Sequence, residues 1–458
     1  MRISRPLIMT AAACLAATVG VAGCDSADTS NGKDSPASNP EVTIAVGDLP
    51  TSDNESGRAY FLDMVAQFEA DNPGIKIDPQ ETVWDAQTFA AQLAAHTLPA
   101  TMTVPFTETR SLIGRGQLYD ITDLVKDDNV FNALDAKALQ AAADESGHYY
   151  GVPTDLFALG VLINRPVFQE AGLDPDGPLT TWDDVSAAMK SITEKTDAAG
   201  MGLLSTNNLG GWILTAMTTA FGGEMETLDG DTAVANVDND GAKAALQWIH
   251  DNNDSMSANA LLDHDTGMTD LAAGNVGMVI GANWYGTLVT GKSMNPEDLG
   301  MFAMPQAPGG LGALGGGSVS IIPADVTEEE AAAAIKWIEF YSLGQYFDLD
   351  GAKERAKADA ADGQAVPTLR LPMVNAEQNA AYLDAVAEYT NVPLDNFASL
   401  LDSSLAVINE PPVEAQQIYA LLDPVVQAVR TDPNADIDQL LADAQAQAVD
   451  ALELAQNG

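Results

Sequence analysis

The sequence predicts an α/β protein in which sheets are covered by helices. Three observations carry this prediction. Strand-like and helix-like segments alternate at the start of the chain, over residues 42–46, 60–68, 75–83 and 85–96. An almost continuous apolar run over residues 156–163 is typical of a strand buried on both faces. The length of 458 residues is enough for two or three lobes.

The opening alternation predicts a parallel sheet and, with it, a place for a ligand. In such sheets ligands bind beyond the carboxyl ends of the strands. Asn54 and Glu55 stand in the polar loop after the first strand, and Trp84 follows the second strand. We therefore regard these three residues as candidate ligand contacts, although a solvated loop or ordinary packing explains them as well.

Residues 149–184 predict a strand, a short helical turn and a capped helix. Pro166 suits the first position of the turn, and Gly172 supplies its left-handed end. Thr181 and Asp184 have the spacing of a capping box. The helix that follows presents Val185, Met189 and Ile192 on one face, so this stretch reads as a crossover between elements of a sheet.

The N-terminus predicts export and lipid attachment. Arg2 and Arg5 precede an apolar run over residues 7–21, which is too short to span a bilayer. The run ends at Cys24 in a small-residue sequence that resembles a lipobox. We expect residues 1–23 to be a signal peptide, Cys24 to carry the lipid (diacylglycerol and palmitate), and residues 24–40 to be a disordered tether.

The charge of the chain restricts the possible partners. Acids outnumber bases 66 to 20, which gives a formal net charge of −46. Such a field repels nucleic acid and anionic membrane surfaces, and it disfavours anionic ligands unless a basic pocket intervenes. Neutral sugars and cations remain compatible with it.

Several motifs together resemble the family 1 extracellular solute-binding proteins, the sugar-capturing lipoproteins of ABC importers. The resemblance begins with Tyr-Gly-Val-Pro at residues 150–153 and continues through the strand that ends at Asn164 and the Thr-Trp-Asp motif at residues 181–183. It covers about residues 41–345. The other matching segments are residues 116–122, 272–284, 305–310 and 315–323.

This resemblance implies a two-lobed periplasmic-binding-protein-like fold of type II, with a ligand cleft between the lobes. Lobe one would comprise residues 41–153 and 304–343, and lobe two residues 154–303 and 344–458. It implies an oligosaccharide ligand, permease subunits of an ABC importer as partners, and no enzymatic activity. We expect a monomer without cofactor or metal, bound to the outer face of the cell membrane only through the lipid on Cys24.

The tryptophans are the first candidates for contact with a sugar, because aromatic rings bind the apolar faces of sugar rings. Trp284 resembles the stacking tryptophan of the family most closely, and Trp212 opens a helix. Trp182, Trp248 and Trp337 lie on apolar helix faces and are better explained as core residues.

Polar and smaller residues complete the list of candidates. For each of them a cap, a turn, packing or a surface ion pair is the alternative explanation. Asp155 follows the Pro153 motif and could bind a hydroxyl group. The remaining candidates are Tyr285, Gly317, Ser318, Phe106 and Arg370.

Other functions find less support in the sequence. Residues 236–247 nearly fit an EF-hand loop but have Gln where the bidentate Glu belongs. The four histidines have no metal-ligand spacing, and no Walker or Rossmann motif occurs. A cationic or peptide solute on the same fold and an exported glycoside hydrolase remain alternatives, the latter because 66 acids could supply a carboxylate pair.

Overall fold

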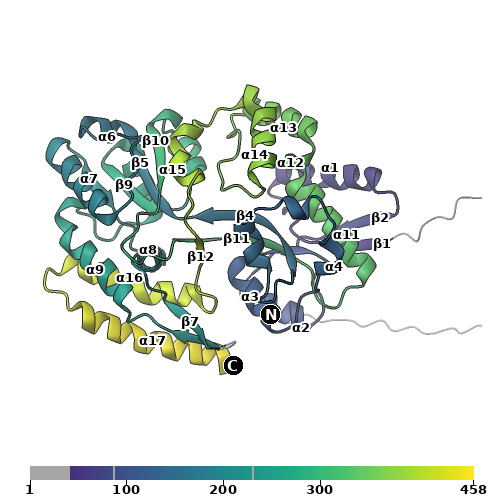
Figure 1. The fold of residues 1–458 in the computed structure, drawn as a ribbon, viewed down its shortest axis with the longest axis horizontal. Helices are drawn as coiled ribbons and strands as arrows, with labels where there is room; N and C mark the ends of the chain where they lie inside the picture. The colour runs from purple at the N-terminus through teal and green to yellow at the C-terminus, as the bar shows by residue number, and fades with distance from the viewer. Residues whose placement is uncertain (1–41, 86–87, 230–231, 458) are drawn as a thin grey trace, which may run out of the picture. The chain divides into compact units, whose positions relative to one another are not determined.

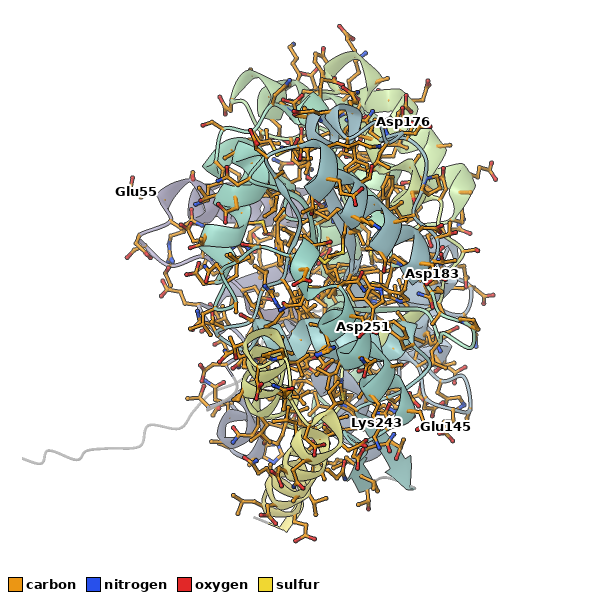
Figure 2. The ribbon with its side chains drawn as sticks, turned by 90° about the vertical axis from the view of Figure 1, so that its left-hand side faces the viewer. Glu55, Glu145, Asp176, Asp183, Lys243 and Asp251 are labelled. Carbon is orange, nitrogen blue, oxygen red and sulfur yellow. The ribbon has the colours of Figure 1, made fainter. Side chains whose placement is uncertain are left out.

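The computed structural model describes residues 42–85, 88–229 and 232–457. The predicted signal peptide, the tether and Cys24 lie outside this range. Within it, no helix combines the length and the apolar character needed to cross a membrane. Charged side chains lie on the outside, and Glu55, Asp176 and Asp183, which Figure 2 labels, are exposed.

Two four-stranded sheets and two strand pairs organise the described residues (Figure 1). The first sheet contains β3 (Met102–Pro105), β4 (Gly151–Ala158), β11 (Ala313–Ile321) and β12 (Val407–Asn409). The second has the order β10 (Leu299–Ala303), β5 (Gly160–Asn164), β9 (Val276–Gly281) and β6 (Ala199–Gly202). The pairs are β1 (Val42–Val46) with β2 (Ile75–Pro79), which are parallel, and β7 (Glu226–Asp229) with β8 (Thr232–Ala235), which are antiparallel.

Helices occupy the connections between these strands. The α-helices are α1 (Glu55–Asp71), α2 (Phe89–Ala94), α3 (Phe106–Gly114), α4 (Thr122–Val125), α5 (Ala136–Leu139), α6 (Arg165–Glu170), α7 (Trp182–Lys195), α8 (Leu209–Ala220), α9 (Asp240–Asp251), α10 (His264–Ala273), α11 (Glu328–Ile338), α12 (Gly344–Phe347), α13 (Leu349–Ala361), α14 (Ala376–Val386), α15 (Ala398–Leu401), α16 (Ala415–Thr431) and α17 (Ile437–Asn457). Shorter helical turns cover Phe131–Ala133, Gln140–Ala142, Asn253–Ser255, Gly286–Gly291, Pro296–Asp298, Glu339–Leu343, Ala387–Tyr389 and Leu394–Phe397.

The apolar run at residues 156–163 is not one strand, as the sequence predicts, but parts of two. β4 pairs with β11 in the first sheet, whereas β5 pairs with β9 and β10 in the second. Leu159 stands between them and donates its backbone N–H to Leu314 O at 2.8 Å. Apolarity predicts burial of the run but cannot show that the strand changes its partners halfway.

The helical expectations for residues 165–195 are confirmed. Pro166 lies in the first turn of α6, and Gly172 follows the helix with a φ of 73°. The side chain of Thr181 accepts from the N–H of Asp184, and the Asp184 carboxylate accepts from the Thr181 N–H. This reciprocal cap fixes the start of α7, whose buried face includes Trp182 and Val185.

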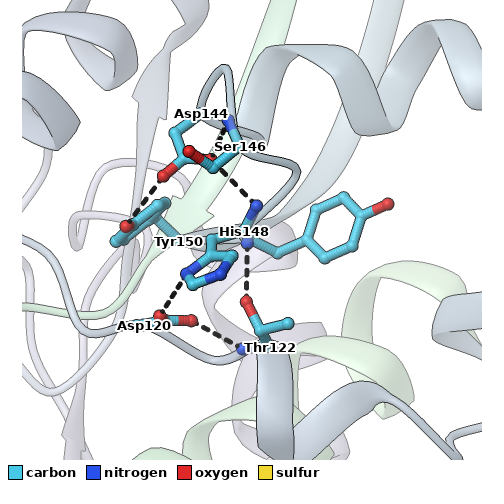
Figure 3. Close-up of polar contacts among 7 residues, drawn as sticks. Asp120, Thr122, Asp144, Ser146, His148 and Tyr150 are labelled. Carbon is cyan, nitrogen blue, oxygen red and sulfur yellow. Dashed lines mark hydrogen bonds and ion pairs between the residues drawn. The ribbon is translucent and has the colours of Figure 1, made fainter.

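A polar hairpin fixes the chain just before β4 (Figure 3). The carboxylate of Asp144 accepts from the N–H groups of Ser146 and His148 and from the Tyr150 hydroxyl. His148 Nδ1 lies 2.9 Å from Asp120 Oδ2, which ties this hairpin to the loop before α4. Burial raises the pKa of Asp120, but hydrogen bonds from Thr122 and His148 outweigh it and lower the pKa overall.

Helix α8 is fixed by a buried carboxylate from another helix. Asp423 of α16 accepts from the N–H groups of Asn208 at 2.8 Å and Gly211 at 2.9 Å. These are N–H groups at the start of α8, which have no partner within the helix. The side chain of Asp423 is 9% exposed, so its loss would leave buried donors unsatisfied.

We therefore expect Asp423→Ala to lower the free energy of unfolding by roughly 2–4 kcal/mol, the cost of a lost cap and of unsatisfied buried N–H groups. Denaturant unfolding followed by circular dichroism measures it. Asp432→Ala is the matched control, because Asp432 is exposed at the other end of α16. Equal losses in the two variants would contradict this role of Asp423.

Candidate ligand-binding site

The candidate site is organised by the antiparallel pair β4 and β11, which we call the hinge strands. Asp155 lies opposite Ser318, and Phe157 lies opposite Gly316. Because side chains alternate along a strand, Asp155 and Phe157 share one face of β4. A β-bulge between Ser318 and Val319 interrupts the pairing next to Asp155, and such bulges re-aim side chains near functional sites.

Two tryptophans from different elements lie beside each other. Trp212 belongs to the first turn of α8, and Trp284 follows β9. Their ring centroids are 6.1 Å apart with an interplanar angle of 44°. Trp284 packs directly on Gly281, where an added Cβ would come within 2.2 Å of the ring, and His264 meets Trp284 edge-on with ring centroids 4.6 Å apart. Both tryptophans are half-buried.

Glu410 is the acidic partner of this aromatic pair. Trp212 Nε1 donates to Glu410 Oε1 at 2.5 Å, and the Tyr419 hydroxyl donates to the same oxygen at 3.1 Å. Burial raises the pKa of Glu410, and the hydrogen bonds from Trp212 and Tyr419 oppose that shift. Sequence reasoning missed this residue. The one signal at residue 410 is an acid directly before Pro411 and Pro412, ahead of α16.

The hinge row, as we call Asp155, Phe157, Glu410, Trp212 and Trp284, is a set of neighbours. Gly316 joins its parts, because an added Cβ there would lie 3.0 Å from Phe157 Cζ and 3.4 Å from Glu410 Oε2. Glu410 in turn contacts Trp212, which contacts Trp284. Phe157 is also half-buried, and the sequence analysis did not select it. The row therefore combines aromatic surface with hydrogen-bond acceptors.

Arg370 approaches the hinge row from the segment between α13 and α14. Its positive charge and the negative charge of Asp155 both act on Tyr346, whose pKa is raised chiefly by burial. Asn283, next to Trp284, donates its side-chain N–H to Leu369 O, which ties this segment to the tryptophan. The structure thus brings Asp155, Arg370 and Trp284 into one region.

Three other sequence candidates also belong to the hinge strands or pack on them. Gly317 and Ser318 are residues of β11 paired with Leu156 and Asp155. Phe106 is buried at the start of α3, and its Cζ would lie 2.7 Å from a Cβ at Gly317. The remaining positions are not part of the hinge strands or the hinge row: Asn54 caps α1, Glu55 is exposed in its first turn, Trp84 packs on the core, and Tyr285 is buried against Phe397.

Carboxylates surround the acidic end of the hinge row. Glu226, 6% exposed, accepts from Val413 N–H with Oε2, while its Oε1 is buried without a hydrogen-bond partner in the described chain. Burial, and less strongly the charge of Glu414, raise the pKa of Glu226 to about 8. Burial also raises the pKa of Glu108 on α3, where Arg115 opposes the shift and Glu414 adds to it.

Comparison with known proteins identifies the family. Residues 52–343 match the family described as bacterial extracellular solute-binding protein. The chain belongs to this family. The two-lobed α/β fold predicted from the sequence is confirmed by solved structures of similar proteins. One is the cyclic α-maltosyl-1,6-maltose binding protein from Arthrobacter globiformis, with a TM-score of 0.65 and 20% identity over 91% of this chain and 100% of that one.

Two further known proteins are similar to this solute-binding protein. The sugar-binding protein MalE from Xanthomonas citri has a TM-score of 0.68 and 17% identity, covering 90% of this chain and 98% of that one. The sn-glycerol-3-phosphate-binding periplasmic protein UgpB from Salmonella paratyphi A is 27% identical over 192 residues, which are 39% of this chain. The chain matches only 42% of the length of that relative.

The opposite face of the hinge strands borders a separate cavity. Leu156 and Ala158 of the solute-binding protein point to this side, and the cavity has a volume of about 200 Å³. Its rim includes Lys137, whose Nζ donates to Ser403 O at 3.0 Å. The hinge strands therefore separate the hinge row from this cavity.

The described residues contain no cluster of three or more side chains suited to hold a metal ion. The segment that resembles an EF-hand, residues 236–247, follows β8 and forms a turn and the first part of α9, with Asn239 capping the helix. In that turn, Asp238 Oδ1 pairs with Lys243 Nζ at 3.1 Å.

The raised pKa of Glu226 predicts a pH dependence of stability. The folded protein holds this proton up to about pH 8, whereas the ordinary pKa of the group is 4.5. Its contribution is therefore fully present below pH 4.5 and is lost as the pH rises to about 8. The unfolding free energy of the wild type should therefore decline between pH 5 and 9. In Glu226→Gln we expect this decline to be smaller by roughly 3–5 kcal/mol.

Denaturant unfolding at a series of pH values tests this expectation. Glu224→Gln, a change at an exposed acid two residues away, should keep the wild-type profile. If the Glu226→Gln profile also followed the wild type, Glu226 would not be the buried group that titrates.

Proposed function

We propose that this solute-binding protein captures a neutral oligosaccharide outside the cell and delivers it to the permease subunits of an ABC importer. The observation that carries the proposal is the pairing of Trp212 and Trp284 with Glu410 at the hinge strands. Aromatic rings bind the apolar faces of sugars, and carboxylates accept hydrogen bonds from the hydroxyl groups at their edges.

Charge favours a neutral ligand over a phosphate ester, the class named for the Salmonella relative. Glu410 lies in the hinge row itself, and the charge of Glu414 acts on both Glu226 and Glu108. Glu226 holds its proton up to about pH 8, so it adds no charge of its own at neutral pH. An anion placed here would be repelled, and the whole chain adds a formal charge of −46. Arg370 and Asp155 influence the same tyrosine, so a carboxylate also accompanies the cation in this region.

The hinge strands give the mechanism of capture its structural basis. β4 leads into β5 of the second sheet through Leu159, and β10 of that sheet leads back into β11. We propose that small rotations at these two crossings close lobe two over a sugar held on the hinge row. The free energy of binding must exceed the cost of closure. Residues 41–153 with 304–343, and 154–303 with 344–458, remain the proposed lobes.

We further propose that the protein is a monomeric lipoprotein held at the outer face of the membrane by Cys24. The proposal rests on the N-terminal sequence, and the extracellular family is consistent with export. A tether of residues 24–40 would allow the folded part to reach a permease.

Trp284→Ala should weaken sugar binding at least about tenfold, because it removes the ring surface on which a sugar stacks. Tryptophan fluorescence and calorimetry, with maltotriose, chitotriose and glycerol 3-phosphate as probes, measure the affinities. Tyr285→Phe is the matched control at the next residue, where the ring is buried against Phe397.

Three results would contradict the proposal. Wild-type protein that binds glycerol 3-phosphate but neither sugar would show a phosphate-ester site. Release of shorter products from the sugars would show an enzyme. An unchanged affinity in Trp284→Ala would remove this ring from the site.

A further inference from the structure

One oxygen of Glu410 is fully occupied by two fixed donors. The indole N–H of Trp212 and the hydroxyl group of Tyr419 both point to Oε1. An indole N–H can only donate. Tyr419 is 1% exposed, and its burial raises the pKa of its hydroxyl group, so this group also remains a donor. The carboxylate is therefore held in one orientation, with Oε1 turned toward α8 and α16.

The same orientation leaves Oε2 unused and places it against the hinge strand. No residue in the described part of the chain donates a hydrogen bond to Oε2, whereas Oε1 receives two. Oε2 lies 3.4 Å from the point where a Cβ on Gly316 would stand, and Phe157 Cζ lies 3.0 Å from that point. A Cβ at residue 316 would crowd both groups, so the glycine allows Glu410 and Phe157 to lie this close to the hinge strand.

We propose that Glu410 is a specificity-determining residue, whose Oε2 accepts a hydrogen bond from a ligand hydroxyl group beside Trp212 and Trp284. The inference rests on the proposed capture of a sugar and identifies the acceptor that recognises one of its hydroxyl groups. A carboxylate oxygen is an acceptor only, so this position selects hydroxyl or ammonium donors and rejects phosphate and carboxylate groups. Oε1 meanwhile sets the orientation of the Trp212 ring.

Glu410→Gln separates the two roles of this side chain. The amide oxygen can still accept from Trp212 and Tyr419, so the ring keeps its orientation, but an NH₂ group replaces Oε2. The probe is maltotriose, or chitotriose where that is the sugar the wild type binds. We expect the affinity of Glu410→Gln for it to fall about tenfold or more, because a charge-assisted hydrogen bond is lost. The fluorescence maximum and Tm of the free protein should stay those of the wild type.

Glu414→Gln is the matched control, because it removes the same charge four residues away. It should change affinity by no more than about threefold, the effect of a nearby but solvated charge. Monodeoxy derivatives of the same sugar identify the hydroxyl group that is read. One derivative should bind to the wild type more weakly than the parent sugar does. To Glu410→Gln the same derivative and the parent sugar should bind with equal affinity.

The outcomes distinguish this inference from the function on which it rests. If the wild type binds a sugar and Glu410→Gln binds it equally well, Glu410 only positions Trp212 and the inference fails alone. If both Gln variants lose affinity equally, the general field and not Oε2 is responsible, and the inference again fails alone. If the wild type binds neither sugar, the proposed function fails and the inference fails with it.

Discussion

The pairing of β4 with β11 is the constraint on which the candidate site depends. The two strands run antiparallel from Gly151 to Ala158 and from Gly315 to Ile321. The chain leaves β4 for the second sheet and enters β11 from it. This pairing places Asp155 and Phe157 on one face and Leu156 and Ala158 on the other. It also brings Gly316 beneath Glu410. A one-residue change of register would reverse every one of these assignments.

Long-range hydrogen bonds hold the aromatic side of the site in place. Asp423 fixes the start of α8 and hence the position of Trp212, and Glu410 fixes the orientation of the Trp212 ring. Both acids come from residues 410–423, far from Trp212 in the sequence. The C-terminal segment therefore shapes a site whose tryptophans belong to the middle of the chain. Because buried polar contacts of this kind are costly to lose, they favour one arrangement of the ring.

The sequence was sufficient for the family, the α/β fold and the local elements of the crossover. Pro166, Gly172, Thr181 and Asp184 predict their structures because the relevant contacts lie within a few residues. The single strand predicted for residues 156–163 was wrong, since burial does not reveal which sheet a strand joins. Trp284 and Trp212 were selected by their positions at element ends, and the structure does place them together.

Glu410 and Phe157 could not be selected from the sequence, because what distinguishes them is contact with residues far away along the chain. Glu410 is one of 66 acids, and only its hydrogen bond with Trp212 distinguishes it.

The central claim is that a sugar binds on Trp212 and Trp284. The most direct measurement is an NMR titration of the tryptophan indole N–H signals with the sugar that calorimetry shows to bind. The account predicts shifts for Trp212 and Trp284, with the signals of Trp182, Trp248 and Trp337 nearly unchanged. Binding that leaves the Trp212 and Trp284 signals unmoved would contradict it.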